Sequence, residues 1–194
     1  MLNPYITLPQ AKKILDPRRV AVLTGALRNA LSTWNTALAP AQMMLNSSAR
    51  AMNINQMWYF FVGLGIDDDP SIILSEDQLQ KFLVIDERVI LRFKLIDRNF
   101  ASRNYPTIRA NQWRLQYSLP SLPQCERLEM GYRLDITGTE VQDAFIILRY
   151  GDTILWLWQI WGDKIDNFEV QLKLGPKTGP EPMVFDYDTY AIGG

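Results

Sequence analysis

The sequence predicts an α+β fold, in which N-terminal helices pack on a C-terminal antiparallel sheet of about five to six strands. In the first part of the chain apolar residues recur at steps of three and four, whereas from near Val89 they alternate with polar residues. The alternating segments are separated by short stretches with turn residues, which favours antiparallel connections. A β-sandwich or jelly roll with an N-terminal helical arm is the alternative.

The first long helix is predicted over residues 17–39. Asp16 can cap its free amides, and Pro17 suits the first helical position because its missing N–H has no partner there. Pro40 is expected to end or kink this helix and to open a second helical segment that runs through Met52.

A third, short helix is predicted near Ser75. Ser75 and Gln78 have the spacing of a capping box, in front of an apolar face made of Leu79, Phe82 and Leu83.

Strands with one polar and one apolar face are predicted by alternation over residues 89–95, 113–119, 128–136 and 168–174. The hairpin from Ala144 to Trp161, which turns at residues 150–153, has arms that are apolar on both faces. We expect these arms in the middle of the sheet, covered on both sides, with the N-terminal helices as one cover.

Three regions follow from these elements. Residues 1–87 form a helical segment, residues 88–174 an antiparallel β region, and residues 175–194 a Pro/Gly linker with an aromatic tail. We expect the first two to form one cooperative domain.

Composition excludes several kinds of chemistry. The chain of 194 residues has no histidine, so Ser-His-Asp and Cys-His catalysis and imidazole metal sites are excluded. Its single cysteine cannot form an internal disulfide. We therefore expect a non-enzymatic protein with no cofactor and no bound metal.

Localisation is predicted from the same features. Residues 1–10 lack the regions of a classical signal peptide, and the apolar run at residues 57–66 is too short to span a bilayer. We expect a soluble protein of the cytoplasm or of a virion, without a membrane partner.

The charges lie in blocks although the net charge is −1. Successive segments 1–66, 67–87, 88–114 and 115–194 carry net charges of +5, −6, +6 and −6. In the third block arginines are interleaved with aromatic residues, a mixture that single-strand binders use to neutralise phosphates and stack on bases. The residues predicted to contact nucleic acid or another anionic partner are Arg98, Phe100, Arg103, Tyr105, Arg109 and Arg114. A basic surface that meets the acidic block of another subunit is an equal alternative.

Residues 41–66 are rich in methionine and aromatic side chains, more than one helix face can bury. They are predicted to form an oligomer interface through Met43, Met44, Met52, Met57, Trp58, Phe60 and Phe61.

Two acidic patterns are weaker signals. The run Asp67-Asp68-Asp69 lacks the spacing of an EF-hand loop, and a solvated turn is the preferred interpretation. Asp152, Asp163, Glu169 and Lys173 faintly resemble the acidic and lysine set of Mg²⁺-dependent nucleases.

Three function classes remain in order of preference. The first is a self-associating interaction protein, a virion or nucleoprotein-like subunit that also contacts single-stranded nucleic acid. The second is a ligand-binding β module in which an exposed Trp113 or Trp161 stacks on a ligand. The third is a carboxylate and Mg²⁺-dependent hydrolase.

Overall fold

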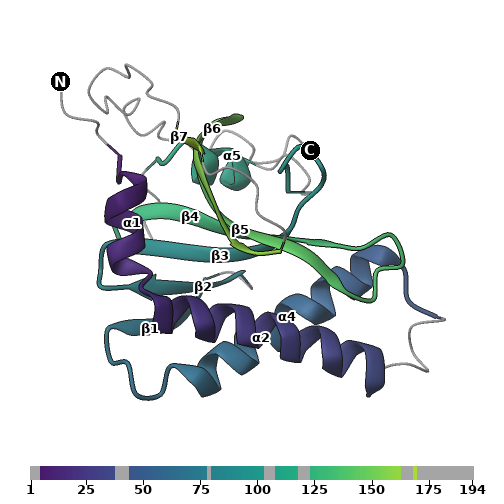
Figure 1. Ribbon diagram of the computed structural model, residues 1–194. Coiled ribbons are helices and arrows are strands. Elements are labelled where there is room, and N and C mark those ends of the chain that lie inside the picture. The colour runs from purple at the N-terminus through teal and green to yellow at the C-terminus, as the bar shows by residue number, and fades with distance from the viewer. Residues whose placement is uncertain are drawn as a thin grey trace, which may run out of the picture.

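A computed structural model describes residues 5–37, 44–77, 80–102, 108–117, 123–162 and 168–169. N-terminal helices precede a sheet, and the predicted α+β class is confirmed (Figure 1). The helices are α1 (Leu8–Ile14), α2 (Pro17–Thr36), α4 (Ser47–Gly65) and α5 (Ile108–Arg114). The strands are β1 (Ile72–Asp77), β2 (Gln80–Ile85), β3 (Val89–Leu95), β4 (Glu126–Leu134), β5 (Val141–Tyr150), β6 (Thr153–Trp161) and β7 (Phe168–Glu169). None of the described helices is long and apolar enough to cross a membrane.

The strands form one sheet in chain order from β1 to β7, and β7 contributes only two residues. Every neighbouring pair is antiparallel except β3 and β4, which run parallel with Phe93 opposite Met130. The sheet is therefore mixed, whereas the predicted one is antiparallel throughout. The physical reason is the long segment between β3 and β4, which contains α5 and crosses the sheet so that β4 starts at the same end as β3.

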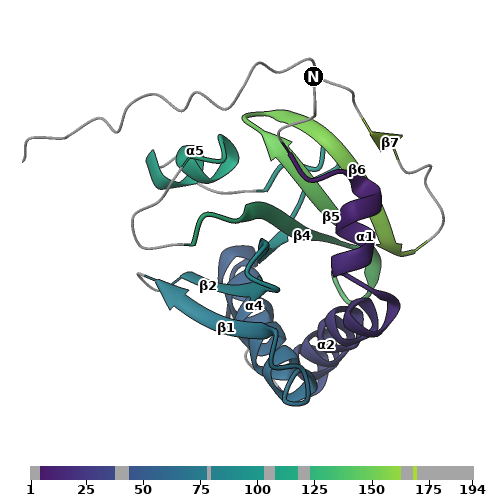
Figure 2. The ribbon, with the colours of Figure 1, turned by 90° about the vertical axis from the view of Figure 1, so that its left-hand side faces the viewer.

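Helices α2 and α4 cover one face of the sheet, which we call the inner face, and α5 lies over the outer face (Figures 1 and 2). The capped start of α2 is confirmed, because the Asp16 carboxylate accepts a hydrogen bond of 2.9 Å from the Arg19 amide. The second helical segment is predicted from Pro40 through Met52, but α4 begins later, at Ser47 after its Asn46 cap, and continues to Gly65.

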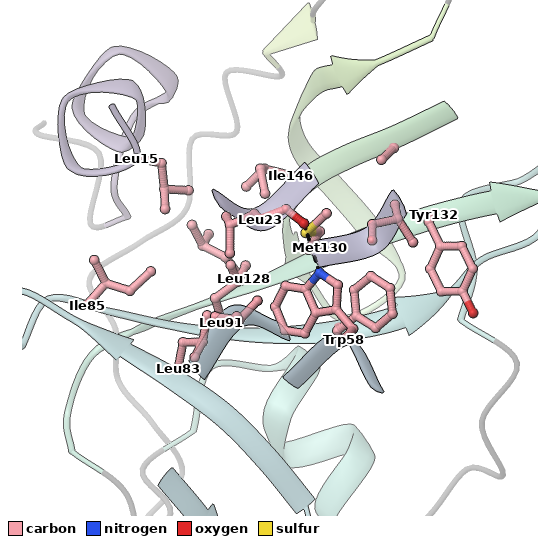
Figure 3. Packing of buried hydrophobic residues seen from close by; sticks show 14 of the residues in the cluster. Leu15, Leu23, Trp58, Leu83, Ile85, Leu91, Leu128, Met130, Tyr132 and Ile146 are labelled. Carbon is pink, nitrogen blue, oxygen red and sulfur yellow. Dashed lines mark hydrogen bonds between the residues drawn. The ribbon is translucent and has the colours of Figure 1, made fainter. Parts of the chain in front are cut away.

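The inner core is built around a stack of aromatic rings (Figure 3). Trp58 of α4 stacks on Phe93 of β3 with ring centres 4.4 Å apart, and Phe93 stacks on Tyr132 of β4 at 4.6 Å. The Trp58 indole donates a hydrogen bond of 3.0 Å to the Leu23 carbonyl of α2, so its one polar atom is satisfied in the core.

The third predicted helix is wrong, because Ser75 lies in strand β1, and β1 pairs with β2 in an antiparallel hairpin. The capping-box spacing is a local signal, and burial of the apolar residues against the sheet overrides it. Leu83 and Ile85 of β2 are buried in the inner core. As a strand, this segment pairs with β3, and a helix here could not form these strand-to-strand hydrogen bonds. The sheet thus begins at Ile72, before residue 88.

The predicted strand at 113–119 is also wrong where the structure describes it, because residues 108–114 form helix α5. As part of a helix, Trp113 instead covers the outer face, and it is buried there with Phe82, Val84 and Ile90.

The apolar hairpin is confirmed as β5 and β6, with β5 between β4 and β6. Ile146 lies in the inner core and Ile147 in an outer one, and both are fully buried, as expected for a strand covered on both sides. Gly151 has φ of +60° in the turn, a conformation that glycine adopts without strain. The predicted strand at 168–174 lies outside the described residues beyond Glu169.

Candidate functional site

Helix α4 exposes five residues at steps of four, and none of them is charged. They are Ser48, Met52, Gln56, Phe60 and Leu64, and we call them the uncharged ridge. Met52, Phe60 and Leu64 each keep about 60% of their surface exposed (62%, 62% and 61%). The only charged residue in the whole helix is Arg50. A solvent-facing helix normally carries charges on this face, so the ridge is unusually apolar.

The opposite face of α4 is fixed in the inner core by Ile54, Trp58, Tyr59 and Val62. The Tyr59 hydroxyl donates to the Lys81 carbonyl of β2 and accepts a hydrogen bond of 3.3 Å from the Phe93 amide of β3. Tyr59 thereby links two strands of the sheet to the helix. The orientation of α4 is set by these contacts, and they leave the uncharged ridge pointing away from the core.

The predicted interface residues divide between these two faces. Met44, Met52 and Phe60 are exposed, Met57 and Phe61 are partly buried against the core, and Met43 lies outside the described residues. Trp58 is fully buried in its own chain, so a partner cannot reach it. Sequence reasoning missed Leu64, although its step of four from Phe60 is a signal that could have found it.

Strand β1 forms an edge of the sheet and exposes two further apolar side chains. Ile73 and Leu74 are 54% and 40% exposed, and β1 pairs with β2 on one side only within the described part of the chain. An unpaired edge with exposed apolar residues is a surface on which another chain can add. The negative charge of Glu76, near the end of β1, reduces the tendency of this edge to pair with another strand.

The outer face carries a buried ion-pair cluster on three adjacent strands. The Glu129 carboxylate of β4 accepts hydrogen bonds from Arg92 of β3 at 3.0 Å and from Arg149 of β5 at 3.2 Å. Burial alone would raise the pKa of Glu129, but the charges of Arg92 and Arg149 outweigh it and hold the pKa below its ordinary value. A carboxylate held in this way is not free to act as a general base.

Trp113 of α5 packs on the arginines of the outer face. Its ring lies 4.6 Å from the Arg92 guanidinium and 5.7 Å from that of Arg127. With 5% of its surface exposed, Trp113 cannot serve as the stacking platform of a ligand-binding module. Trp161 is partly exposed but is covered by Arg28, whose guanidinium lies 5.0 Å from the ring.

Lys94 of β3 also belongs to the outer face, and it forms no ion pair with the described residues. Burial lowers its pKa to about 8, and the charge of Arg92 acts in the same direction. An amine with this pKa is a potential nucleophile. The acid whose charge acts on the pKa of Lys94 is Glu129, and its carboxylate is already bound by Arg92 and Arg149. Glu129 is therefore not available to Lys94 as a general base.

The arginine and aromatic residues predicted to contact nucleic acid do not form one exposed surface within the described part of the chain. Arg98 is exposed, whereas the Phe100 ring packs edge-on against Phe145 at 5.1 Å and Arg114 pairs with Asp152 at 3.2 Å. Arg109 lies in α5, and Arg103 and Tyr105 lie outside the described residues. Contact with nucleic acid through this segment stays a prediction.

The acidic run before Pro70 forms a turn in which Asp67 and Asp68 are exposed. Asp69 differs, because its carboxylate pairs with Arg19 of α2 at 2.9 Å, and Arg19 also pairs with Asp86 at 2.8 Å. Across the described ranges, no three acidic or cysteine side chains are grouped so that they could hold a metal ion. Of the nuclease-like set, Asp163 and Lys173 lie outside those ranges.

No protein-family model, curated protein or solved structure matches this chain. The functional argument therefore depends on the geometry of the described residues.

Proposed function

We propose that this protein is a non-enzymatic interaction protein that self-associates through the uncharged ridge of α4. The observation that carries the proposal is the exposure of Met52, Phe60 and Leu64 on a helix face without charge. Complete burial of one such side chain from water contributes about 1.5 to 3 kcal/mol, and each of the three has somewhat more than half of its surface left to bury. Their burial therefore favours association before the entropic cost of binding is counted.

The spacing of the ridge suits a second copy of the same chain. Residues at steps of four form a ridge that packs into the matching groove of another helix at a crossing angle of about −50°. A two-fold axis beside Gln56 would place Met52 opposite Phe60 of the second copy, and the reverse. This pairing is self-complementary, as two-fold symmetry requires, and methionine sulfur packs favourably on aromatic rings.

The lack of charge also favours a second copy over a charged partner. A two-fold contact brings residues beside the axis near their own counterparts, and like charges there would repel. The ridge has none, and Gln56 at the centre can exchange hydrogen bonds with its counterpart across the axis.

The non-enzymatic part of the proposal is supported by the absence of histidine and by the state of the buried acids. Glu129 is held by two arginines, and Asp143 is held by Arg133 in a two-point pair. Neither carboxylate is free to move a proton or to ligate a cation.

Light scattering coupled to size-exclusion chromatography tests this function on the full chain over a range of concentrations. We expect a dimer or larger assembly for the wild type and a monomer for Phe60→Glu, because each introduced carboxylate would be buried without a partner against Met52 of the other copy. Ile136→Glu is the matched control, since Ile136 is fully exposed in the turn after β4 and lies off the ridge.

The proposal fails if the wild type is monomeric at every concentration, or if Phe60→Glu associates as the wild type does. Loss of assembly in Ile136→Glu but not in Phe60→Glu would assign the contact to another surface.

A further inference from the structure

A hollow of about 200 Å³ lies where the end of α2 meets the start of α4. It is lined by Trp34 of α2 and by Leu45, Asn46, Ser47 and Arg50. The turn between β4 and β5 lies near the start of α4 in Figure 1, and the Arg50 guanidinium lies against Gly138 of that turn. Since one liquid water occupies roughly 30 Å³, the hollow has room for several waters or for one small ion.

Arg50 enters this hollow without a neutralising partner. Its Nε is buried and has no hydrogen-bond partner, and its side chain forms no ion pair within the described residues. The neighbouring residues 38–43 contain no acidic side chain in the sequence, so they cannot supply one. Asp135, in the turn between β4 and β5, accepts hydrogen bonds from the Thr139 and Glu140 amides of its own turn.

Gly138 keeps space for the guanidinium. A Cβ atom at this position would collide with Nη1 of Arg50, and φ of +74° also favours glycine here. The Tyr132 hydroxyl, on which the charge of Arg50 acts, is also buried and has no hydrogen-bond partner among the residues described. Buried polar atoms without a partner are uncommon.

The first turn of α4 adds further donors. It contains no acidic residue, so the partial positive charge of the helix N-terminus is not compensated. The Asn46 side chain caps only the Ala49 amide, at 2.9 Å, and the exposed Ser47 hydroxyl stands at the rim.

We propose that this hollow binds a small oxyanion of the size of phosphate through the Arg50 guanidinium, the Ser47 hydroxyl and the first amides of α4. An arginine and a helix N-terminus together form the donor set that phosphate groups accept from in proteins. The site is separate from self-association, because Arg50 and Ser47 do not belong to the uncharged ridge.

Isothermal titration of the full chain with inorganic phosphate at low ionic strength tests the site, with sodium chloride as the blank. We expect saturable binding to the wild type and about tenfold weaker binding to Arg50→Gln, the effect of losing a hydrogen bond to a charged group. Arg88→Gln is the matched control, because it makes the same charge change at an exposed turn residue and should bind as the wild type does.

Adenosine monophosphate in a parallel titration distinguishes the source of the phosphate. Tighter binding than inorganic phosphate, lost in Arg50→Gln, assigns the site to the phosphate of a larger ligand, and equal binding assigns it to the free ion. If Arg50→Gln loses its far-UV circular dichroism, Ser47→Ala decides instead, since this exposed residue is not needed for folding. No saturable binding to the wild type, or wild-type binding by Arg50→Gln or by the deciding Ser47→Ala, overturns the proposal.

Discussion

Arg19 joins three parts of the chain that are distant in sequence. Its guanidinium donates to the Ile14 carbonyl at the end of α1, pairs with Asp69 in the turn before β1, and pairs with Asp86 in the turn after β2. Asp86 has φ of +51°, a conformation that is unfavourable for a residue with a side chain. The ion pair offsets this cost by fixing the carboxylate in place.

The same cluster predicts an acid dependence of stability. Hydrogen bonds from Arg19 and then Ser71 lower the pKa of Asp69 to about 2, below the ordinary value of about 3.9 for an unfolded aspartate. A lowered folded-state pKa contributes stability above pH 4, and this contribution is lost as the pH falls through 4 toward 2. Asp69→Asn should therefore unfold at lower urea than the wild type at pH 7, by about 1 kcal/mol, with the difference vanishing near pH 2.

Urea unfolding of both proteins between pH 2 and pH 7 measures this. Asp68→Asn is the control, because its carboxylate is exposed and forms no ion pair in the described chain. Equal pH profiles for Asp69→Asn and the wild type would show that the Arg19 pair adds nothing to stability.

At the scale of elements, α4 combines two requirements along one helix. It must approach α2 closely at its C-terminal end and must expose the uncharged ridge along its length. Gly65 shows the first requirement, because a Cβ atom there would lie 2.7 Å from Cγ1 of Val22 in α2. Gly63, two residues earlier, has nothing within 4 Å of a Cβ atom.

These two glycines make a matched pair of substitutions. Gly63→Ala should stabilise the protein by about 0.5 to 1 kcal/mol, because alanine restricts the unfolded chain and fits the helix. Gly65→Ala should lose that gain and destabilise the protein, because the β-branched Val22 side chain has little freedom to move aside. Thermal unfolding of both variants tests the contrast, and an equal change in Tm would contradict the close contact with Val22.

At the scale of the whole molecule, one core connects the helices to the sheet. Residues of α1, α2, α4 and strands β1 to β6 belong to the same inner cluster of buried side chains. Leu27 of α2 is fully buried in it, as are Ile54 of α4 and Ile146 of β5. Such a shared core favours a single unfolding transition.

Leu27→Ala tests this cooperativity from one helix. The cavity should cost about 2 to 5 kcal/mol, and hydrogen exchange should accelerate in β5 as much as in α2 if both unfold together. Ile136→Ala, at an exposed position, should leave exchange unchanged. Faster exchange confined to α1, α2 and α4 would show that the helical segment and the sheet unfold separately.

Elements with local sequence signals could be predicted without knowledge of the fold. Asp16 and Pro17 start α2 through a cap that needs no distant residue. The alternation in β3 and β4 indicates half-buried strands, and the apolar runs of β5 and β6 indicate strands buried on both faces. The order of helices before a sheet, and hence the α+β class, follows from those periodicities. The methionine and aromatic content of α4 also indicated a surface that one chain cannot fully bury.

Which neighbour each segment meets depends on the folded chain. Ser75 lies in a strand because β1 pairs with β2 at the edge of the sheet. Trp113 lies in a helix that buries it against Phe82, Val84 and Ile90 on the outer face. Local residue spacing does not predict these distant contacts. The division of α4 into a buried Trp58 face and an exposed Phe60 face depends on the direction from which α2 and the sheet approach. That Arg50 forms no ion pair with the described residues, and that its Nε is buried without a hydrogen-bond partner, follows from the folded chain and from no motif.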